Sequence, residues 1–148
     1  MANLKVTLSE ELKLDGQEYG ATRSFIIPAI DEAFKRKVTC PASQTTTIAV
    51  FAAEVRTSPG AIDVNDARYV RITNLDTTNT MTIACVGASD NFQVVVQPEQ
   101  SFALGKVDDF MLGETDTTPA FTSFEDLASI QINPGGNAID VEVFVASA

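Results

Sequence analysis

A strict alternation of apolar and polar residues, repeated in short segments between turn signals, constrains this chain more than any other feature. From Arg68 onward, Val70 and Ile72 fall on one side of an extended chain, whereas Tyr69 and Arg71 fall on the other. A period of two is typical of a strand that buries one face. The same alternation returns over residues 81–85, 92–96, 102–104, 128–132 and 139–145.

Turn signals separate these segments and predict how they pair. The run Asn74-Leu75-Asp76-Thr77-Thr78-Asn79 is rich in side chains that bond their own backbone, so the chain reverses there. Pro134-Gly135-Gly136-Asn137 predicts a hairpin between the last two alternating segments. Near the start, Leu4, Val6 and Leu8 indicate one strand, and Leu12 and Leu14 indicate a second strand after a break. The turn signal Asp15-Gly16 then predicts a hairpin with residues 22–27 as the partner. Pro28 is expected to end that strand.

The spacing of about nine or ten short strands, without a long helical pattern, predicts an all-β fold. We expect an antiparallel β-sandwich, jelly-roll-like, in one domain over residues 1–148. Two segments stand apart from the pattern. Residues 1–8 are expected to act as a terminal arm, and residues 105–126 form a long irregular loop.

The residue types present argue against catalysis. The chain has no histidine, so the commonest general base and the usual zinc ligand sets are missing. No serine lies in a nucleophile elbow, and the paired carboxylates such as Asp108 and Asp109 are typical of solvated loops. Cys40 and Cys85 are expected to be buried small hydrophobes. We therefore expect no enzyme activity, no cofactor and no bound metal.

Charge and hydropathy restrict the classes of partner that we expect for this chain. The net charge is −10, and residues 107–148 hold eight acids and no base, so nucleic-acid binding is not expected. No apolar run approaches the length of a membrane span. The first residues lead straight into an alternating segment rather than an apolar signal region, so we expect synthesis in a cytoplasm without a secretory signal.

Three groups of residues are candidates for contacts with a partner protein. Leu4, Val6 and Leu8 lie on one side of an extended terminal segment that could add to a neighbour's sheet. Lys35 and Lys37 share one face of a strand, where they are either solvated or in contact with an acidic protein surface, such as the acidic C-terminal half of a neighbouring copy. The third group lies in the irregular loop, which either covers one end of the sandwich or docks on a partner: Phe110, Met111, Leu112, Phe121 and Phe124.

One stretch resembles a known family. The strand Tyr69-Val70-Arg71-Ile72-Thr73-Asn74, its following turn, and the segment Gln97-Pro98-Glu99-Gln100-Ser101-Phe102 are similar to small β-rich virion structural proteins of tailed bacteriophages, especially marine phages and cyanophages. The likeness extends from Leu4 to Leu104 and over residues 141–147. Glu99-Gln100 stands where the family's pattern has a glycine.

The resemblance implies a capsid decoration (cement) protein on the virion surface, made in the host bacterial cytoplasm. Such a protein would bind the major capsid protein at capsomer junctions, together with copies of itself, often as a trimer. Two other classes remain open: a tail or neck structural subunit, and a receptor- or glycan-binding module of a phage fibre. An arm-like interface would favour decoration, and an exposed aromatic cluster on loops would favour the binding module. Deleting residues 1–8 is expected to abolish capsid binding.

Overall fold

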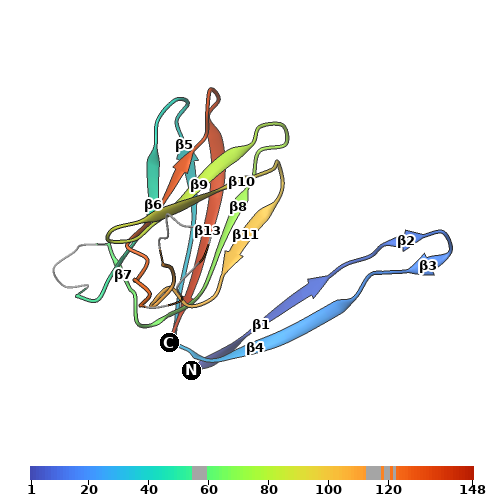
Figure 1. Ribbon diagram of the computed structural model, residues 1–148, viewed down its shortest axis with the longest axis horizontal. Helices are drawn as coiled ribbons and strands as arrows, with labels where there is room; N and C mark the ends of the chain where they lie inside the picture. The colour runs from blue at the N-terminus through green and yellow to red at the C-terminus, as the bar shows by residue number, and fades with distance from the viewer. Residues whose placement is uncertain (55–59, 113–117, 119–120, 122) are drawn as a thin grey trace.

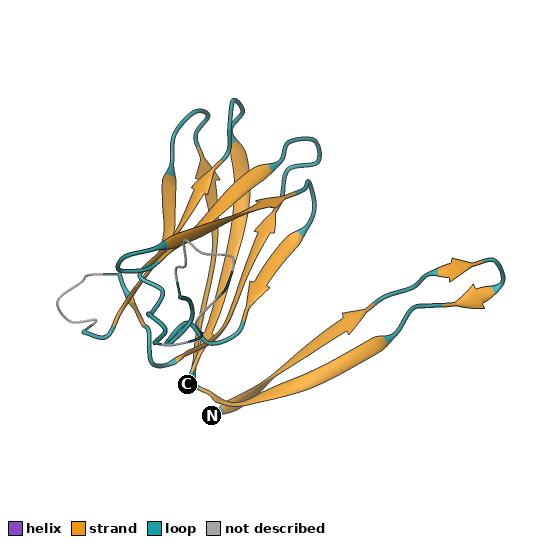
Figure 2. Ribbon diagram, viewed as in Figure 1, coloured by secondary structure: helices purple, strands orange, loops and turns teal. Residues whose placement is uncertain are grey.

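A computed structural model describes residues 1–148 except 55–59, 113–117, 119–120 and 122, and its described residues form strands and loops without a helix (Figures 1 and 2). The fold is all-β, as the alternation predicts. The strands are β1 (Ala2–Ser9), β2 (Lys13–Leu14), β3 (Gln17–Glu18), β4 (Thr22–Ile30), β5 (Glu32–Cys40), β6 (Thr46–Ala52), β7 (Ile62–Asp63), β8 (Ala67–Asn74), β9 (Met81–Val86), β10 (Asn91–Val96), β11 (Ser101–Leu104), β12 (Ser129–Asn133) and β13 (Ile139–Ser147). Several of these are two-residue pieces, so the described chain holds more strands than the nine or ten expected.

The body of the protein is a sandwich of two sheets (Figure 1). One sheet has the strand order β10-β9-β12-β6-β7, and the other has the order β11-β8-β13-β5. The strands pair antiparallel, except for the short parallel contact of β6 with β7. The hairpin predicted around Pro134-Gly135 joins β12 in the first sheet to β13 in the second, so it crosses between the layers instead of pairing two neighbouring strands.

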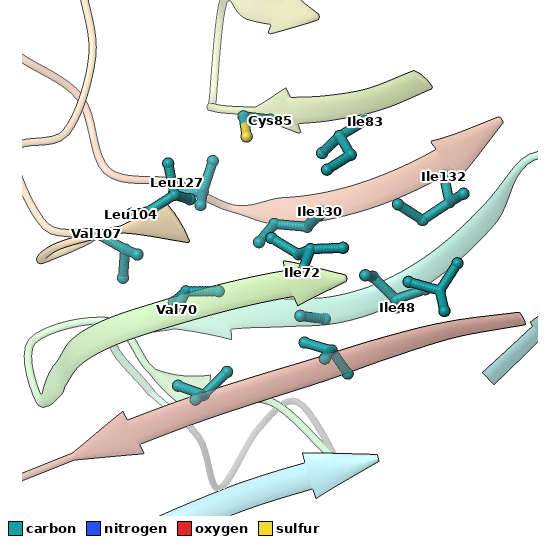
Figure 3. Packing of buried hydrophobic residues seen from close by; sticks show 14 of the residues in the cluster. Ile48, Val70, Ile72, Ile83, Cys85, Leu104, Val107, Leu127, Ile130 and Ile132 are labelled. Carbon is teal, nitrogen blue, oxygen red and sulfur yellow. The ribbon is translucent and has the colours of Figure 1, made fainter. Parts of the chain in front are cut away.

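The core lies between the two sheets, where the alternating residues meet (Figure 3). Val70 and Ile72 of β8 are fully buried and face Ile83, Ile130 and their neighbours on the opposite sheet. Burying one such side chain contributes about 1.5–3 kcal/mol. The prediction that the apolar residues of these alternating segments face the core is therefore confirmed for β8, β9, β12 and β13.

One strand departs from this alternation. Ile48 is buried, but Val50 is 38% exposed, although alternation along residues 46–52 places both on the same side of the strand. The register between β12 and β6 shifts between Ile130 and Gln131, so Ile48 and Ala49 are both buried and Val50 turns outward. A bulge of this kind inserts a residue on one strand and reverses the faces beyond it.

The turn predicted after β8 is organised by a buried polar residue. The side-chain amide of Asn74 donates to the carbonyl of Asn79 at 2.8 Å and to that of Gln97 at 3.2 Å, and its Oδ1 accepts from the Asp76 amide at 3.0 Å. A buried amide needs such partners. Asn74 thereby holds the turn after β8 against the turn that precedes β11.

The first thirty residues leave the sandwich as a long hairpin (Figure 1). β1 pairs with β4, and β2 pairs with β3 at the far end. Both chain termini lie at the root of the hairpin, beside the body. β4 runs through Pro28 to Ile30, so the expectation that Pro28 ends the strand is wrong. Pro28 is tolerated because the β1–β4 register is irregular between Ala2 and Leu4, opposite this position.

The predicted irregular loop closes one end of the sandwich. Among the described residues of 105–126, Met111 and Glu125 form an isolated bridge. Val107 and Met111 belong to the core, and the ring of Phe110 packs 6.0 Å from that of Phe92. Glu125 accepts hydrogen bonds from the amides of Ser89 and Asp90 at 3.1 Å each, which anchors the loop to the β9–β10 turn.

Candidate assembly interface

The hairpin of residues 1–30, called the arm from here on, is the most distinctive surface of the molecule. Its shaft consists of residues 2–9 and 22–30, and its tip consists of residues 10–21. Of the twelve large hydrophobic residues exposed in the described chain, seven lie in the arm. They are Met1, Leu8, Leu12, Leu14, Tyr19, Phe25 and Ile26.

The register of β1 with β4 sorts the shaft into two different faces. Residues directly opposite each other in an antiparallel pair share a face. Leu4 lies opposite Ile27, Val6 opposite Phe25 and Leu8 opposite Arg23. The apolar members of this surface are called the arm face: Leu4, Val6, Leu8, Phe25 and Ile27.

The other face of the shaft is polar apart from Ile26. Thr7 and Ser24 join their hydroxyl groups at 3.0 Å, and Ser9 and Thr22 do so at 2.9 Å. In each pair the two hydroxyl groups bond to each other across the strands, and the side chains are exposed to solvent. The shaft is thus a two-stranded ribbon with one apolar and one polar surface.

The tip is built for a sharp reversal. Asp15 and Gly16 both adopt positive φ, 50° and 80°, between the paired residues Leu14 and Gln17. Two positive φ values match the tight hairpin turn that Asp-Gly predicts. Farther back, Gly20 comes so close to the Glu10 carbonyl oxygen that a side chain at this position would overlap it. The tip is therefore specified by the sequence.

The apolar arm face has no second layer within the described chain. Phe25 is 52% exposed and Leu8 is 61% exposed. A two-stranded ribbon is at best marginally stable in water until its apolar side packs on something else. Contiguous exposed apolar surface of this kind marks an interaction site. The arm is therefore our candidate assembly interface.

The structure brings some of the predicted contact residues together. Leu4, Val6 and Leu8 share the arm face, and the expected terminal arm of residues 1–8 is one strand of the longer ribbon. Sequence reasoning missed Phe25 and Ile27, which complete that face. Pairing the residues on either side of the Asp15-Gly16 turn one by one along both strands places Phe25 opposite Val6 and Ile27 opposite Leu4.

The loop candidates do not contribute to the arm face, and they are divided between the core and the surface. Phe110 and Met111 pack into the body, and Leu112 is half-buried. Phe121 is 75% exposed and Phe124 is 44% exposed. The loop therefore covers the end of the sandwich with its first apolar residues and leaves two phenylalanines at the surface.

Lys35 and Lys37 lie on the outer surface of the β11-β8-β13-β5 sheet, in ion pairs with their own chain. Lys37 Nζ lies 2.7 Å from Asp140 Oδ2, and Lys35 Nζ lies 3.4 Å from Glu142 Oε2. Arg71 also donates to Glu142, at 2.5 Å. This surface is called the charged face.

Asp140 is held ionised by these contacts. The hydrogen bond from Lys37 comes first, and one from the Thr39 hydroxyl at 2.6 Å adds to it, so the pKa of Asp140 is lowered from 3.8. Such pairs on an exposed sheet contribute little to stability, because water screens them. Contact of Lys35 and Lys37 with a partner stays a prediction.

The outer surface of the other sheet is different in kind. Following the register from β10 through β9 and β12 to β6, Gln93 lies beside Ala84, Ala84 beside Gln131, and Gln131 beside Thr47. Parallel rows hold Val95 with Thr82 and Val86 with Ser129. Of the described residues that point outward from these four strands, none carries a charge. This surface is called the neutral face.

A third feature is an open groove of about 700 Å³ beside the root of the arm. Phe34 and Ile62 contribute apolar surface to it. Its other lining residues include four acids: Asp31, Glu32, Asp63 and Asp66. In the described part of the chain, no three cysteine, aspartate or glutamate side chains are grouped closely enough to hold a metal ion. Nor does the described chain contain a helix with the length and hydropathy to cross a membrane.

The chain was compared with known proteins. No protein-family model matches it, and no curated relative matches it. Among solved structures, one from work on Bacillus endospore appendages, described as a novel family of disulfide-linked pili, shares 12% sequence identity. The match covers 78% of this chain and 88% of the other, with a TM-score of 0.38. A similarity this loose carries no argument.

Proposed function

We propose that this protein is a structural subunit that decorates and reinforces a bacteriophage capsid, and that its arm makes the assembly contacts. The observation that carries the proposal is the arm face, in which Leu4, Val6, Leu8, Phe25 and Ile27 project from the sandwich with no layer of the described chain above them. The resemblance of residues 69–74 and 97–102 to phage virion proteins is the reason for proposing a bacteriophage capsid as the assembly.

The physical basis of reinforcement is multivalency. Each contact of a decoration protein with the major capsid protein or with another copy buries about 800–1,600 Å² in total, which is modest. A closed lattice sums these contacts, because every bound copy presents its remaining sites at high local concentration. An arm that reaches away from its own body suits this role, since it links subunits whose centres are far apart.

The copy number per particle tests the proposal. Quantitative mass spectrometry on purified virions of the phage that encodes this chain would give its ratio to the major capsid protein. Decoration predicts a fixed ratio with on the order of hundreds of copies over a symmetric shell. About a dozen copies would instead assign the protein to a neck or tail ring, and absence from the virion would overturn the proposal.

A further inference from the structure

We propose that the arm face of one copy packs on the neutral face of a second copy. The inference rests on the proposed function only in taking the arm as the assembly element. It names what the arm binds: the outer surface of the sheet β10-β9-β12-β6 of another molecule of this chain.

Neither of the two surfaces has a charged side chain at its centre. The arm face is apolar, and its single charged neighbour on that side of the ribbon is Arg23 at the outer end. Gln93, Ala84, Gln131 and Thr47 form the central row of the neutral face. Covering these uncharged side chains removes water from amides and hydroxyls, which costs less free energy than removing water from ions. Ala84 lies in that row with a small side chain, so a ribbon can approach the sheet closely.

The alternative surfaces of the body are poorer receptors for the arm face. On the charged face an apolar ribbon would remove water from two adjacent ion pairs, Lys35 with Glu142 and Lys37 with Asp140. Desolvating such pairs is costly. In the groove at the arm root it would cover the carboxylates of Asp31, Glu32, Asp63 and Asp66. Packing the arm face on either surface therefore carries a larger desolvation penalty than packing it on the neutral face.

The shaft and one rim of the neutral face carry opposite charges. The shaft holds two bases, Lys5 and Arg23, and no acid. Residues 31–148 hold seven bases and sixteen acids, a net charge of −9. Acids also follow one rim of the neutral face, with Asp90 directly before β10 and Asp126 shortly before β12. The two bases of the shaft therefore reduce the repulsion between copies that each carry a net charge of −10, and Arg23 has carboxylates to meet at that rim.

The dimensions of the two surfaces also agree. Seven register pairs join β1 to β4, so at about 3.4 Å per residue the shaft is roughly 25 Å long and two strands wide. Four strands about 4.8 Å apart make the neutral face roughly 19 Å across. The ribbon can therefore lie over the sheet as a second layer about 10 Å away.

The contact joins two different surfaces, so each copy gives one arm and receives one. A heterologous contact of this kind closes into a ring or continues as a lattice, depending on the rotation between copies. A ribbon of this length and width covers less than the roughly 1,200–2,000 Å² that stable interfaces bury in total, so in solution the contact forms as weak, concentration-dependent association. On a capsid, neighbouring copies are held close together, and the same contact links them into a net.

Site-specific cross-linking of the full-length protein tests the inference. One population carries Leu8→Cys on the arm face, and a second, differently tagged population carries Gln93→Cys on the neutral face. The native Cys40 and Cys85 are buried and do not compete. A bismaleimide linker of about 10 Å matches the spacing of packed sheets. The matched controls are Thr7→Cys on the polar side of the shaft, Thr73→Cys on the charged face and Ala61→Cys in the groove.

We expect the Leu8→Cys and Gln93→Cys pair to give about tenfold more mixed dimer than any control pair. Equal or greater yield with Thr73→Cys or Ala61→Cys would overturn the inference, as would the absence of mixed dimer for every pair. A second measurement needs no cysteine: sedimentation of Ala84→Lys should show association lost, while Thr73→Lys, placed opposite Glu142, should associate like the unaltered protein. Loss of association by neither variant would also contradict the inference. If cross-linking fails but capsid binding still depends on the arm, the arm binds the major capsid protein, and the proposed function stands without this inference.

Discussion

Lys37 Nζ lies 2.7 Å from Oδ2 of Asp140, on adjacent antiparallel strands that are about a hundred residues apart in sequence. The lysine was a candidate for contact with a partner's acidic surface, and here it meets an acid of its own chain. Of the eight acids in residues 107–148, Asp140 and Glu142 pair with lysines of β5, and Asp108 pairs with Lys106.

This pair makes stability depend on pH in the acid range. The pKa of Asp140 is lowered from 3.8 by its hydrogen bonds from Lys37 and Thr39. A carboxyl with a depressed folded-state pKa contributes stability above its unfolded value and loses it as pH falls through the folded value. We expect Asp140→Asn to lower the free energy of unfolding slightly at neutral pH and to lower it less near pH 2, where falling pH protonates Asp140. Denaturant titration at both pH values checks this, and an equal loss at both would contradict it.

The two thiols are expected to be inert in the folded protein. Burial raises the pKa of Cys85 to about 11, and it also raises the pKa of Cys40. At neutral pH the reactive thiolate is therefore scarce and shielded. A thiol reagent should label the native protein no faster than the body unfolds, and should label both cysteines at once in denaturant. Rapid labelling of either thiol without denaturant would show that the core opens locally at that strand.

Gly20 is expected to be essential to the arm and irrelevant to the body. In Gly20→Ala the new methyl group would overlap the Glu10 carbonyl oxygen, so the shaft and tip must separate. Overpacking of this kind costs about 1–3 kcal/mol. Hydrogen exchange should accelerate at the Tyr19 amide, which donates to the Leu12 carbonyl. Gly136→Ala, which has open space around the new atom, is the matched control and should leave exchange unchanged. Unaltered exchange in Gly20→Ala would show that the close approach of Gly20 to Glu10 does not hold the arm together.

The body is expected to fold without the arm. Among the described residues, the core cluster begins at Cys40, with Phe34 and Val38 packed against it, and Ile30 at the root is the one buried arm residue. A chain of residues 30–148, which keeps Ile30, should therefore unfold with a free energy within about 0.5 kcal/mol of the full protein, the range of changes made away from a core. Calorimetry of both chains measures this. A large drop in the unfolding temperature would mean that the arm folds back on the body.

The sequence predicts the layers of this fold well, because alternation is a local signal. Val70, Ile72, Ile83 and Ile132 are all buried where their period places them. Val50 shows the limit of that reasoning. The register shift that turns it outward depends on how β12 meets β6, and nothing within residues 46–52 indicates it.

The candidate interface could be predicted only in part, for a related reason. Leu4, Val6 and Leu8 are visible as one face of an extended segment, whereas the lack of any covering layer is a property of the folded molecule. The neutral face was not predicted, since Gln93, Ala84 and Gln131 come from three strands that become neighbours only in the sheet. Surfaces assembled from distant strands leave no periodic trace in the chain.

Binding to capsids that lack the decoration protein tests the central claim most directly. Phe25→Ser and Ile26→Ser alter adjacent exposed residues of β4 that point to opposite sides of the shaft. Burying a phenylalanine contributes about 1.5–3 kcal/mol, so Phe25→Ser should weaken binding by about tenfold or more. Ile26→Ser should bind like the unaltered protein. Equal occupancy of the shell by both variants would show that the arm face is not the surface that holds this protein in its assembly.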